Sequence, residues 1–185
     1  MISAPDIGHV YPKTGLDADL RFDTTPKFVS TGSYFFDGSN DNIDLNGLTW
    51  TSSGGAWSIS FWTRTNQTSD GRWFEIDNIG TGHDVNIQII SSNLKIYTNG
   101  DGGVGMITAV SGTDYADGAW HHFCLTVSSG TTGKFYIDGI ERGSFTLSGD
   151  IDMSDTTGNP DSTARLACSS SDSGFIAANM AHFAI

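Results

Sequence analysis

The stretch Trp120–Gly139, W-H-H-F-C-L-T-V-S-S-G-T-T-G-K-F-Y-I-D-G, decides the fold. On both sides of a polar cluster, apolar side chains take every second position: Phe123, Leu125, Val127, Phe135 and Ile137. A period of two is the pattern of β-strands with one buried and one exposed face. Residues 128–133 are rich in Ser, Thr and Gly and predict a turn, and Asp138-Gly139 predicts a second turn. We therefore expect a hairpin that continues into a third strand at Ile140.

Similar alternation recurs along the chain between clusters of Gly, Ser, Asn and Asp. The clearest further strand is Trp57–Thr65, in which Trp57, Ile59 and Phe61 share one face. Shorter strands are expected at 33–36, 42–45, 72–77, 84–90, 94–98, 104–110, 142–147, 165–168 and 175–185. No long stretch shows helical periodicity. The sequence therefore predicts an all-β protein, in which two antiparallel sheets pack face to face as a jelly-roll β-sandwich.

One domain is expected, because 185 residues suit a single hydrophobic core. Within it, residues 1–31 are predicted to form an N-terminal arm or edge strand and residues 32–185 the sandwich. Cys124 and Cys168 are interpreted as buried free thiols rather than a disulfide, which would require their strands to face each other. The side chains expected in the core are those of Trp57, Ile59, Phe61, Phe123, Leu125, Phe135 and Ile137.

The formal net charge of −12 limits the classes of partner. It argues against nucleic acids, whose binding relies on Lys and Arg at the phosphates, and against anionic membrane surfaces. Membrane insertion is not expected, because no apolar run approaches the roughly 20 residues that a spanning helix needs. The charge fits a solvated extracellular or particle surface, and it also fits cation binding.

Four stretches, in the same order, resemble laminin G-like domains of the concanavalin A-like lectin/glucanase superfamily. One is the hairpin with its W-H-H and Y-I-D-G ends. The others are Y-F-F-D-G-S-N-D-N-I (Tyr34–Ile43), W-S-I-S-F-W-T-R (Trp57–Arg64) and G-F-I-A-A-N-M-A-H-F-A-I (Gly174–Ile185). The resemblance runs from Gly32 to the C-terminus and implies a concanavalin A-like sandwich. Function is implied more broadly, because one fold carries many functions.

Three function classes follow from this resemblance. The first is a non-enzymatic recognition module that binds a carbohydrate or protein surface through rim loops. The second is a structural protein of a virion surface, a decoration or fibre component with virion neighbours or copies of itself as partners. Residues 1–10 lack the basic and apolar regions of a signal peptide, which favours this alternative. The expected location is therefore extracellular or on a virion. The third class is a glycoside hydrolase.

Hydrolase activity is not expected. Family 16 glucanases on this fold carry an E-x-D-x-E or E-x-D-x-x-E strand, which Glu75-Ile76-Asp77 resembles. A retaining glycosidase needs a nucleophile and a separate acid/base carboxyl group. The third acidic position of the motif falls here on Ile79 or Gly80, so the acid/base is missing. We interpret Glu75 as part of the polar face of an ordinary strand.

The resemblance also implies a calcium site at the sandwich rim, with Asp84 and Asp172 as the metal ligands. Calcium takes six to eight oxygen ligands, so two aspartates would need help from carbonyls, hydroxyls or water. Because sheet residues are committed to packing, binding is expected on the rim loops. The predicted ligand-binding residues are Thr81, His83, Asp84, Ser170, Ser171 and Asp172.

Side chains outside the rim offer weaker signals. Arg64, Trp73 and Tyr115 are candidates for stacking on sugars, whose C–H surfaces suit aromatic faces, although a tryptophan in a sandwich also suits the core. His121 and His122 are adjacent on a strand, so they point to opposite faces and cannot share one metal ion.

Overall fold

The computed structural model describes residues 32–45, 56–77, 84–100, 103–111, 115–128, 132–146, 163–169 and 173–185. These residues form strands and connections without a helix, so nothing among them is a helix long and apolar enough to cross a membrane. The predicted arm at residues 1–31 lies outside them and stays a prediction.

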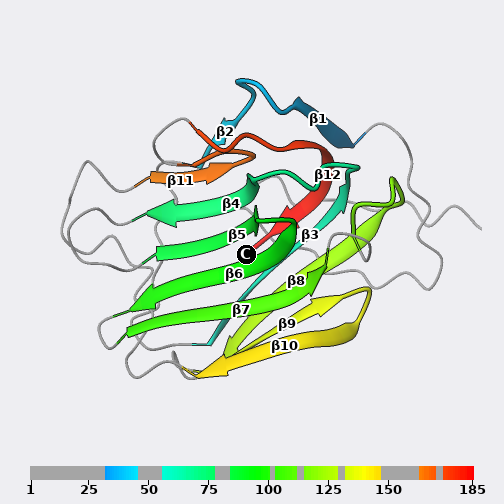
Figure 1. The fold of residues 1–185 in the computed structure, drawn as a ribbon. Helices are drawn as coiled ribbons and strands as arrows, with labels where there is room; N and C mark the ends of the chain where they lie inside the picture. Colours follow the sequence, from blue (N-terminus) through cyan, green and yellow to red (C-terminus); the bar gives the residue numbers. More distant parts are fainter. Residues whose placement is uncertain are drawn as a thin grey trace, which may run out of the picture.

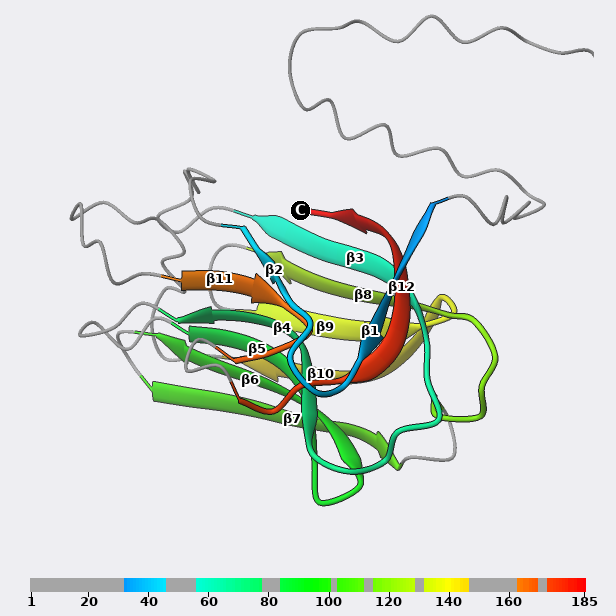
Figure 2. The ribbon, with the colours of Figure 1, turned by 90° about the horizontal axis from the view of Figure 1, so that it is seen from above.

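Twelve strands of the described residues form two antiparallel sheets that pack face to face (Figures 1 and 2). The first sheet has the order β1 (Ser33–Asp37), β12 (Ala177–Ala184), β3 (Trp57–Arg64), β8 (His121–Ser128), β9 (Thr132–Ile137) and β10 (Ile140–Thr146). The second sheet has the order β2 (Ile43–Asp44), β11 (Thr163–Leu166), β4 (Gly71–Asp77), β5 (Asp84–Ile90), β6 (Asn93–Gly100) and β7 (Gly103–Ser111). The predicted all-β sandwich is therefore confirmed.

The predicted hairpin is present as β8 and β9, with Leu125 opposite Phe135 in the register. The chain then turns through Asp138 and Gly139, whose φ angles are 53° and 76°. A two-residue turn with positive φ at both positions matches the right-handed twist of the strands it joins. β10 consequently pairs with β9 and completes the predicted three-strand meander.

The core lies between the sheets and contains the side chains predicted for it. Phe123 is at its centre, with its ring centroid 5.1 Å from that of Trp73 and 5.4 Å from that of Phe61. Trp57 is partly buried at the margin, whereas the other six predicted residues are fully enclosed. Both cysteines are free thiols; Cys168 is buried and Cys124 is half-buried.

Strand β11 ends earlier than the sequence predicted, at Leu166 rather than at residue 168. Ala167 takes a φ of 69°, a left-handed conformation that leaves the strand, and its N–H donates to the carbonyl of Trp73 at 3.0 Å. The chain then folds back so that the N–H of Ile176 donates to the carbonyl of Ala167 at 3.1 Å. This turn brings the segment after Ser173 beside the start of β4.

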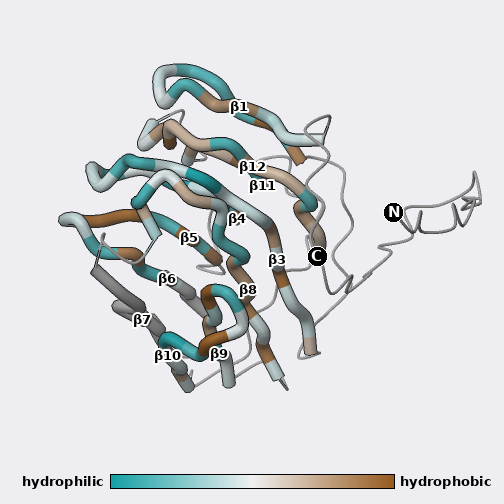
Figure 3. The backbone as a smooth tube through the Cα atoms, turned by 90° about the vertical axis from the view of Figure 1, so that its right-hand side faces the viewer, coloured by the Kyte–Doolittle hydropathy of each residue, from teal (hydrophilic) through white to brown (hydrophobic). Residues whose placement is uncertain are grey.

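Strand β1 is the outermost strand of the first sheet and pairs with β12 on one side (Figure 3). Phe36 points into the core, while Tyr34 and Phe35 are exposed by 67% and 66%. Two large aromatic side chains on an edge strand are unusual for a free surface, because burying such a side chain is favourable. The surface beside this edge is therefore a candidate binding surface.

Candidate functional site

A groove of about 880 Å³ lies next to this edge, where β1, β12 and the connection from β3 to β4 meet. One wall comes from β1 and the turn after it, at Phe35 and Gly38. The opposite wall comes from the 64–70 segment, and the segment 174–179 forms the third side. Gly118 completes the lining, so the groove combines four segments that are far apart in the sequence.

A row of outward-facing residues crosses the first sheet at the groove. Phe35 is opposite Asn179 in the β1–β12 register, and Asn179 is opposite Arg64 in the β12–β3 register. The Arg64 Nη2 donates to Asn179 Oδ1 at 3.1 Å. The Arg64 guanidinium carbon lies 5.6 Å from the centroid of the Trp120 ring, within the range of a cation–π contact. The row therefore presents an aromatic ring, an amide and an oriented guanidinium.

Gln67 fixes the floor of the groove through its side-chain amide. Its Oε1 accepts the N–H of Ala177 at 2.6 Å, and its Nε2 lies 3.1 Å from the carbonyl oxygen of Asp70 and 3.3 Å from those of Ser69 and Phe175. The Thr65 hydroxyl donates to the carbonyl of Ala177 at 2.6 Å. Because one side chain joins the 65–70 segment to the start of β12, the groove is preformed.

The charges in the groove are unevenly compensated. Asp37 Oδ1 accepts the N–H of Ser39 at 2.8 Å, and Asp70 Oδ1 accepts the N–H of Ser91 at 2.9 Å. Arg64 is the one cation among the lining residues, and within the described part of the chain it has no ion pair with a carboxylate. Its positive charge is thus directed to solvent and to the groove.

The loop before β8 is held in place by His121. Its Nδ1 lies 2.8 Å from Asp138 Oδ2 and its Nε2 lies 3.1 Å from Asp117 Oδ1. Burial of the ring favours the neutral form, but the hydrogen bonds that the ring donates to the two carboxylates, together with their charges, outweigh it and raise the pKa of His121. Asp117 belongs to the same loop as Gly118, whose N–H donates to the carbonyl of Thr65 at 3.0 Å. His121 therefore connects the β9–β10 turn to the loop that reaches the groove.

His122 lies on the opposite side of β8, as the sequence predicted. Its ring centroid is 5.1 Å from that of Trp62, which is opposite it in the β3–β8 register. Burial lowers the pKa of His122, with the charge of Asp138 acting in the other direction. The pair extends the aromatic surface along the sheet, one row away from Arg64.

The predicted rim site falls mostly outside the described residues. This applies to Thr81, His83, Ser170, Ser171 and Asp172. Asp84 is the first residue of β5 and is paired with Asn99, but its side chain is not among those described. Within the described residues, no group of three or more His, Cys, Asp and Glu could hold a metal ion. Calcium at Asp84 and Asp172 therefore stays a prediction.

The base of the late rim loop is ordered by serines. The N–H of Ser169 donates to the carbonyl of Ser173 at 2.8 Å, and the two hydroxyl oxygens are 2.9 Å apart. The N–H of Ser173 also lies 3.1 Å from the Ser169 hydroxyl. Ser169 and Ser173 are thus held in direct contact with each other.

Two of the three residues considered for sugar stacking belong to the core. Trp73 and Tyr115 are fully buried, with ring centroids 5.7 Å apart in an edge-to-face arrangement. The Trp73 indole N–H donates to the hydroxyl of Thr63 at 2.9 Å, and burial raises the pKa of Tyr115 to about 12. Neither ring can reach a sugar on the surface, so the core alternative is correct for Trp73 and the stacking prediction is wrong for Tyr115. Arg64 is exposed and lines the groove.

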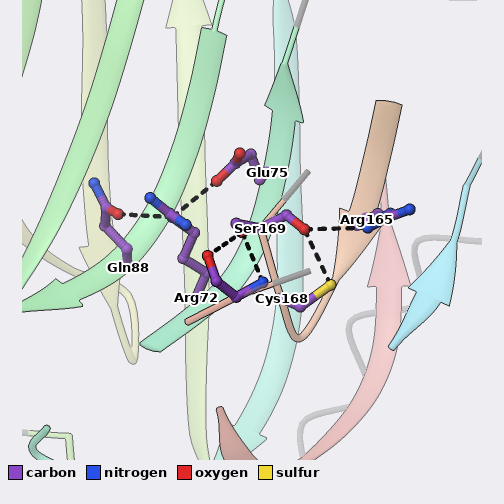
Figure 4. Close-up of polar contacts among 7 residues, drawn as sticks. Arg72, Glu75, Gln88, Arg165, Cys168 and Ser169 are labelled. Atoms are coloured by element: carbon purple, nitrogen blue, oxygen red, sulfur yellow. Dashed lines mark hydrogen bonds and ion pairs between the residues drawn. The ribbon is translucent and has the colours of Figure 1, made fainter. Parts of the chain in front are cut away.

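Glu75 lies in a polar network on the second sheet, which Figure 4 shows. The Arg72 Nε lies 2.8 Å from Glu75 Oε2 and 3.0 Å from Gln88 Oε1. Glu75 is 6% exposed. A buried carboxylate held in an ion pair is satisfied by its partner and poorly placed to attack a substrate. Its environment is thus that of a structural residue.

Phe35, Asn179 and Trp120 were not predicted from the sequence to share one surface. Phe35 is marked in the sequence by the run Tyr34-Phe35-Phe36, in which alternation can bury only one face. Asn179 carries no comparable signal, because its role depends on β12 lying between β1 and β3. The strand order that assembles the row could not be derived from local patterns.

Two packed antiparallel sheets with this strand arrangement define a jelly-roll sandwich of the type that carries many recognition surfaces. A laminin G family model, described as the concanavalin A-like lectin/glucanases superfamily, matches residues 37–185. The chain belongs to this superfamily, and the predicted family is confirmed.

Solved structures share this fold. Domains LG4-5 of the mouse laminin alpha1 chain superpose with a TM-score of 0.62 at 16% identity, covering 86% of this chain and 42% of that one. The binding domain of botulinum neurotoxin serotype D in complex with N-acetylneuraminic acid gives 0.59 at 14% identity, covering 83% and 38%. The chain thus spans about two fifths of the length of these structures. No curated protein matches the sequence significantly.

Proposed function

We propose that this chain is a non-enzymatic recognition domain that binds a carbohydrate in the groove beside β1. The observation that carries the proposal is the row of Phe35, Asn179 and Arg64, continued by Trp120. Phe35 is 66% exposed and offers an apolar face, which suits the C–H surface of a sugar ring. Asn179 and Arg64 offer an amide and a guanidinium, which suit hydroxyl and carboxyl groups. Apolar surface with a few fixed polar groups is the usual composition of a ligand site.

The preformed floor supports binding rather than a merely open surface. Gln67 and Thr65 hold the 65–70 segment against β12 by hydrogen bonds of 2.6 Å to Ala177. A site that is already in its bound shape loses less conformational entropy on binding. Comparison with the neurotoxin domain, whose structure contains N-acetylneuraminic acid, adds support for a sugar ligand, whereas the laminin domains leave a protein ligand open.

We infer that the domain acts outside the cell, as laminin G-like domains do, and that it does not hydrolyse its ligand. The ion pair between Glu75 and Arg72 supports the second inference. Incubation with β-glucans, followed by an assay for reducing ends, is expected to show no turnover. Turnover abolished by Glu75→Gln would contradict it. A virion-surface role stays a prediction.

Binding to an immobilised glycan panel tests the proposal, with and without calcium. Phe35→Ala is expected to weaken binding of the glycans that the wild-type protein retains. Ile140→Ala is the matched control, because Ile140 is 57% exposed on β10 at the other edge of the same sheet. Equal loss in both variants, or binding that survives Phe35→Ala unchanged, would contradict a site in the groove.

The same experiment distinguishes a ligand site in the groove from one at the predicted rim. Asp84→Ala and Asp172→Ala are expected to leave glycan binding in the groove intact. If binding is lost in these variants and retained in Phe35→Ala, the ligand binds at the predicted rim and not beside β1.

A further inference from the structure

Arg64 forms no ion pair with a carboxylate within the described part of the protein. Three of the other five described cations are paired with carboxylates at 2.8 Å, Arg72 with Glu75, Arg165 with Asp44, and Lys134 with Glu141, whereas Lys95 and Arg142 are not. Arg64 lines the groove without such a partner, in a chain whose net charge is −12. In a chain with acidic groups in excess, an arginine that lines a candidate site and pairs with no described carboxylate leaves its charge available to a ligand. It points to an anionic group on the ligand.

The guanidinium is also oriented. Asn179 Oδ1 accepts a hydrogen bond from Nη2 at 3.1 Å, and the Trp120 ring lies against the guanidinium face at 5.6 Å. No hydrogen bond or ion pair of Nε or Nη1 with another described side chain is found. An arginine offers its N–H groups in a planar fork that fits the two oxygens of a carboxylate. Contacts that hold the plane in place lower the entropy lost when such a pair forms.

The remaining charges favour a ligand that carries few negative charges. Asp37 and Asp70 also line the groove, and the protein as a whole repels anions. A polysulfated or polyphosphorylated ligand would need several cations, whereas Arg64 is the one cation among the lining residues. A sugar with a single carboxylate needs one arginine, and the rest of its surface can contact Phe35 and the amide of Asn179. The balance of charges therefore selects a carboxylated sugar over a sulfated or phosphorylated one.

We propose that the groove binds a carbohydrate bearing a carboxylate, a uronic or sialic acid residue, with Arg64 as the group that binds the carboxylate. This inference rests on the proposed carbohydrate-binding function and narrows it to one ligand class. Phe35 contacts the apolar face of a sugar ring, and Asn179 holds Arg64 in its binding orientation.

Calorimetric titration with two matched pairs of ligands tests the inference and separates the two acids. One pair is a β-1,4-linked uronic acid tetrasaccharide and its carboxyl-reduced, neutral form. The other pair is sialyllactose and lactose. The acidic member of at least one pair is expected to bind roughly tenfold to hundredfold more tightly than its neutral counterpart, which is the range of a hydrogen bond to a charged group.

Variants of Arg64 identify the group responsible. Arg64→Gln is expected to remove the preference for the acidic ligand while leaving the weak affinity for the neutral one unchanged. Arg64→Lys keeps the charge but loses the fork, so it should restore part of the preference. Both substitutions are made at an exposed position on the sheet surface. Melting temperatures equal to that of the wild type would show that the fold is intact.

The possible failures are distinguishable. Equal binding of acidic and neutral members, weakened by Phe35→Ala, would overturn the carboxylate inference and leave the proposed function standing. An acidic preference that survives Arg64→Gln would also overturn it. Absence of binding by every ligand in these pairs and in the glycan panel would overturn the proposed function itself.

Discussion

His121 Nδ1 lies 2.8 Å from Asp138 Oδ2, so the start of β8 is joined to the turn between β9 and β10. The second ring nitrogen lies 3.1 Å from Asp117 Oδ1. Both nitrogens face carboxylates, so both donate only when the ring is protonated. Burial lowers the pKa of His121, but the hydrogen bonds that the ring donates to Asp138 and Asp117, with the charges of these carboxylates, outweigh this effect and raise the pKa above its ordinary value of 6.5. The contact therefore stabilises the protonated form of the ring.

A dependence of stability on pH follows from the direction of this shift. Because the folded-state pKa of His121 exceeds the unfolded value, its contribution is fully present below about pH 6.5 and is lost as the pH rises through the folded pKa. The wild type should therefore melt at a higher temperature than His121→Gln, and the difference between the two melting temperatures should be largest near pH 5.5 and smaller near pH 9. A difference that is constant with pH would contradict the assignment.

His122 supplies a matched control on the same strand. Burial lowers its pKa, so its neutral form is favoured in the folded protein. Its stabilising contribution is present above about pH 6.5 and is lost as the pH falls. The difference between the wild type and His122→Gln should thus change with pH in the direction opposite to that for His121→Gln.

Phe123 is expected to be the most sensitive core position among the aromatic residues. Its ring centroid lies 5.1 Å from that of Trp73, 5.4 Å from that of Phe61 and 5.5 Å from that of Phe135. Phe123→Ala would leave a cavity that these rings cannot fill, and should lower the free energy of unfolding by about 3–5 kcal/mol. Denaturant titration measures this. Phe35→Ala, at an exposed position, should change it by less than about 0.5 kcal/mol; similar losses in both would contradict the assigned core.

The fold could be predicted from the sequence because its determinants are local. The alternation around Phe123 and the Asp138-Gly139 turn fix a hairpin whose register then follows from the turn itself. Trp73 was ambiguous, since an aromatic residue on a strand suits either the core or a ligand, and only its position between the sheets decides for the core.

The groove could not be predicted, because it depends on strand order. Arg64 and Asn179, which share a hydrogen bond, are 115 positions apart in the sequence. Alternation places Arg64 on an outward face but does not reveal that β12 and β1 lie beside it. The predicted ligand site was therefore placed on the rim loops, because the superfamily resemblance implies a site around Asp84 and Asp172.

Gln67 is expected to stabilise the groove more than its partly exposed position suggests. Gln67→Ala removes the acceptor of the Ala177 N–H at 2.6 Å and the donor to the carbonyl oxygen of Asp70 at 3.1 Å. Partners left unsatisfied should lower the free energy of unfolding by about 1–3 kcal/mol. Gln67→Glu keeps the acceptor but directs a carboxylate at backbone carbonyl oxygens, so it should not restore stability. Asn66→Ala, at the exposed neighbouring position, is the control; an equal loss there would show that the loop and not the amide is responsible.

The prediction of calcium at the rim rests on the superfamily resemblance alone, and no described side chain supports it. Asp84 and Asp172 supply two carboxylates at most, and the ion needs six to eight oxygens, so carbonyls, hydroxyls or water must complete the shell. We therefore expect weak binding, detected as a calcium-dependent rise in melting temperature that grows with concentration, as ligand linkage requires. The rise should disappear in Asp84→Ala and in Asp172→Ala and persist in Asp41→Ala, an acidic residue in the turn after β1. No heat of calcium binding and no rise in the wild type would remove the metal from this protein, and a rise that survives both rim substitutions would place it elsewhere.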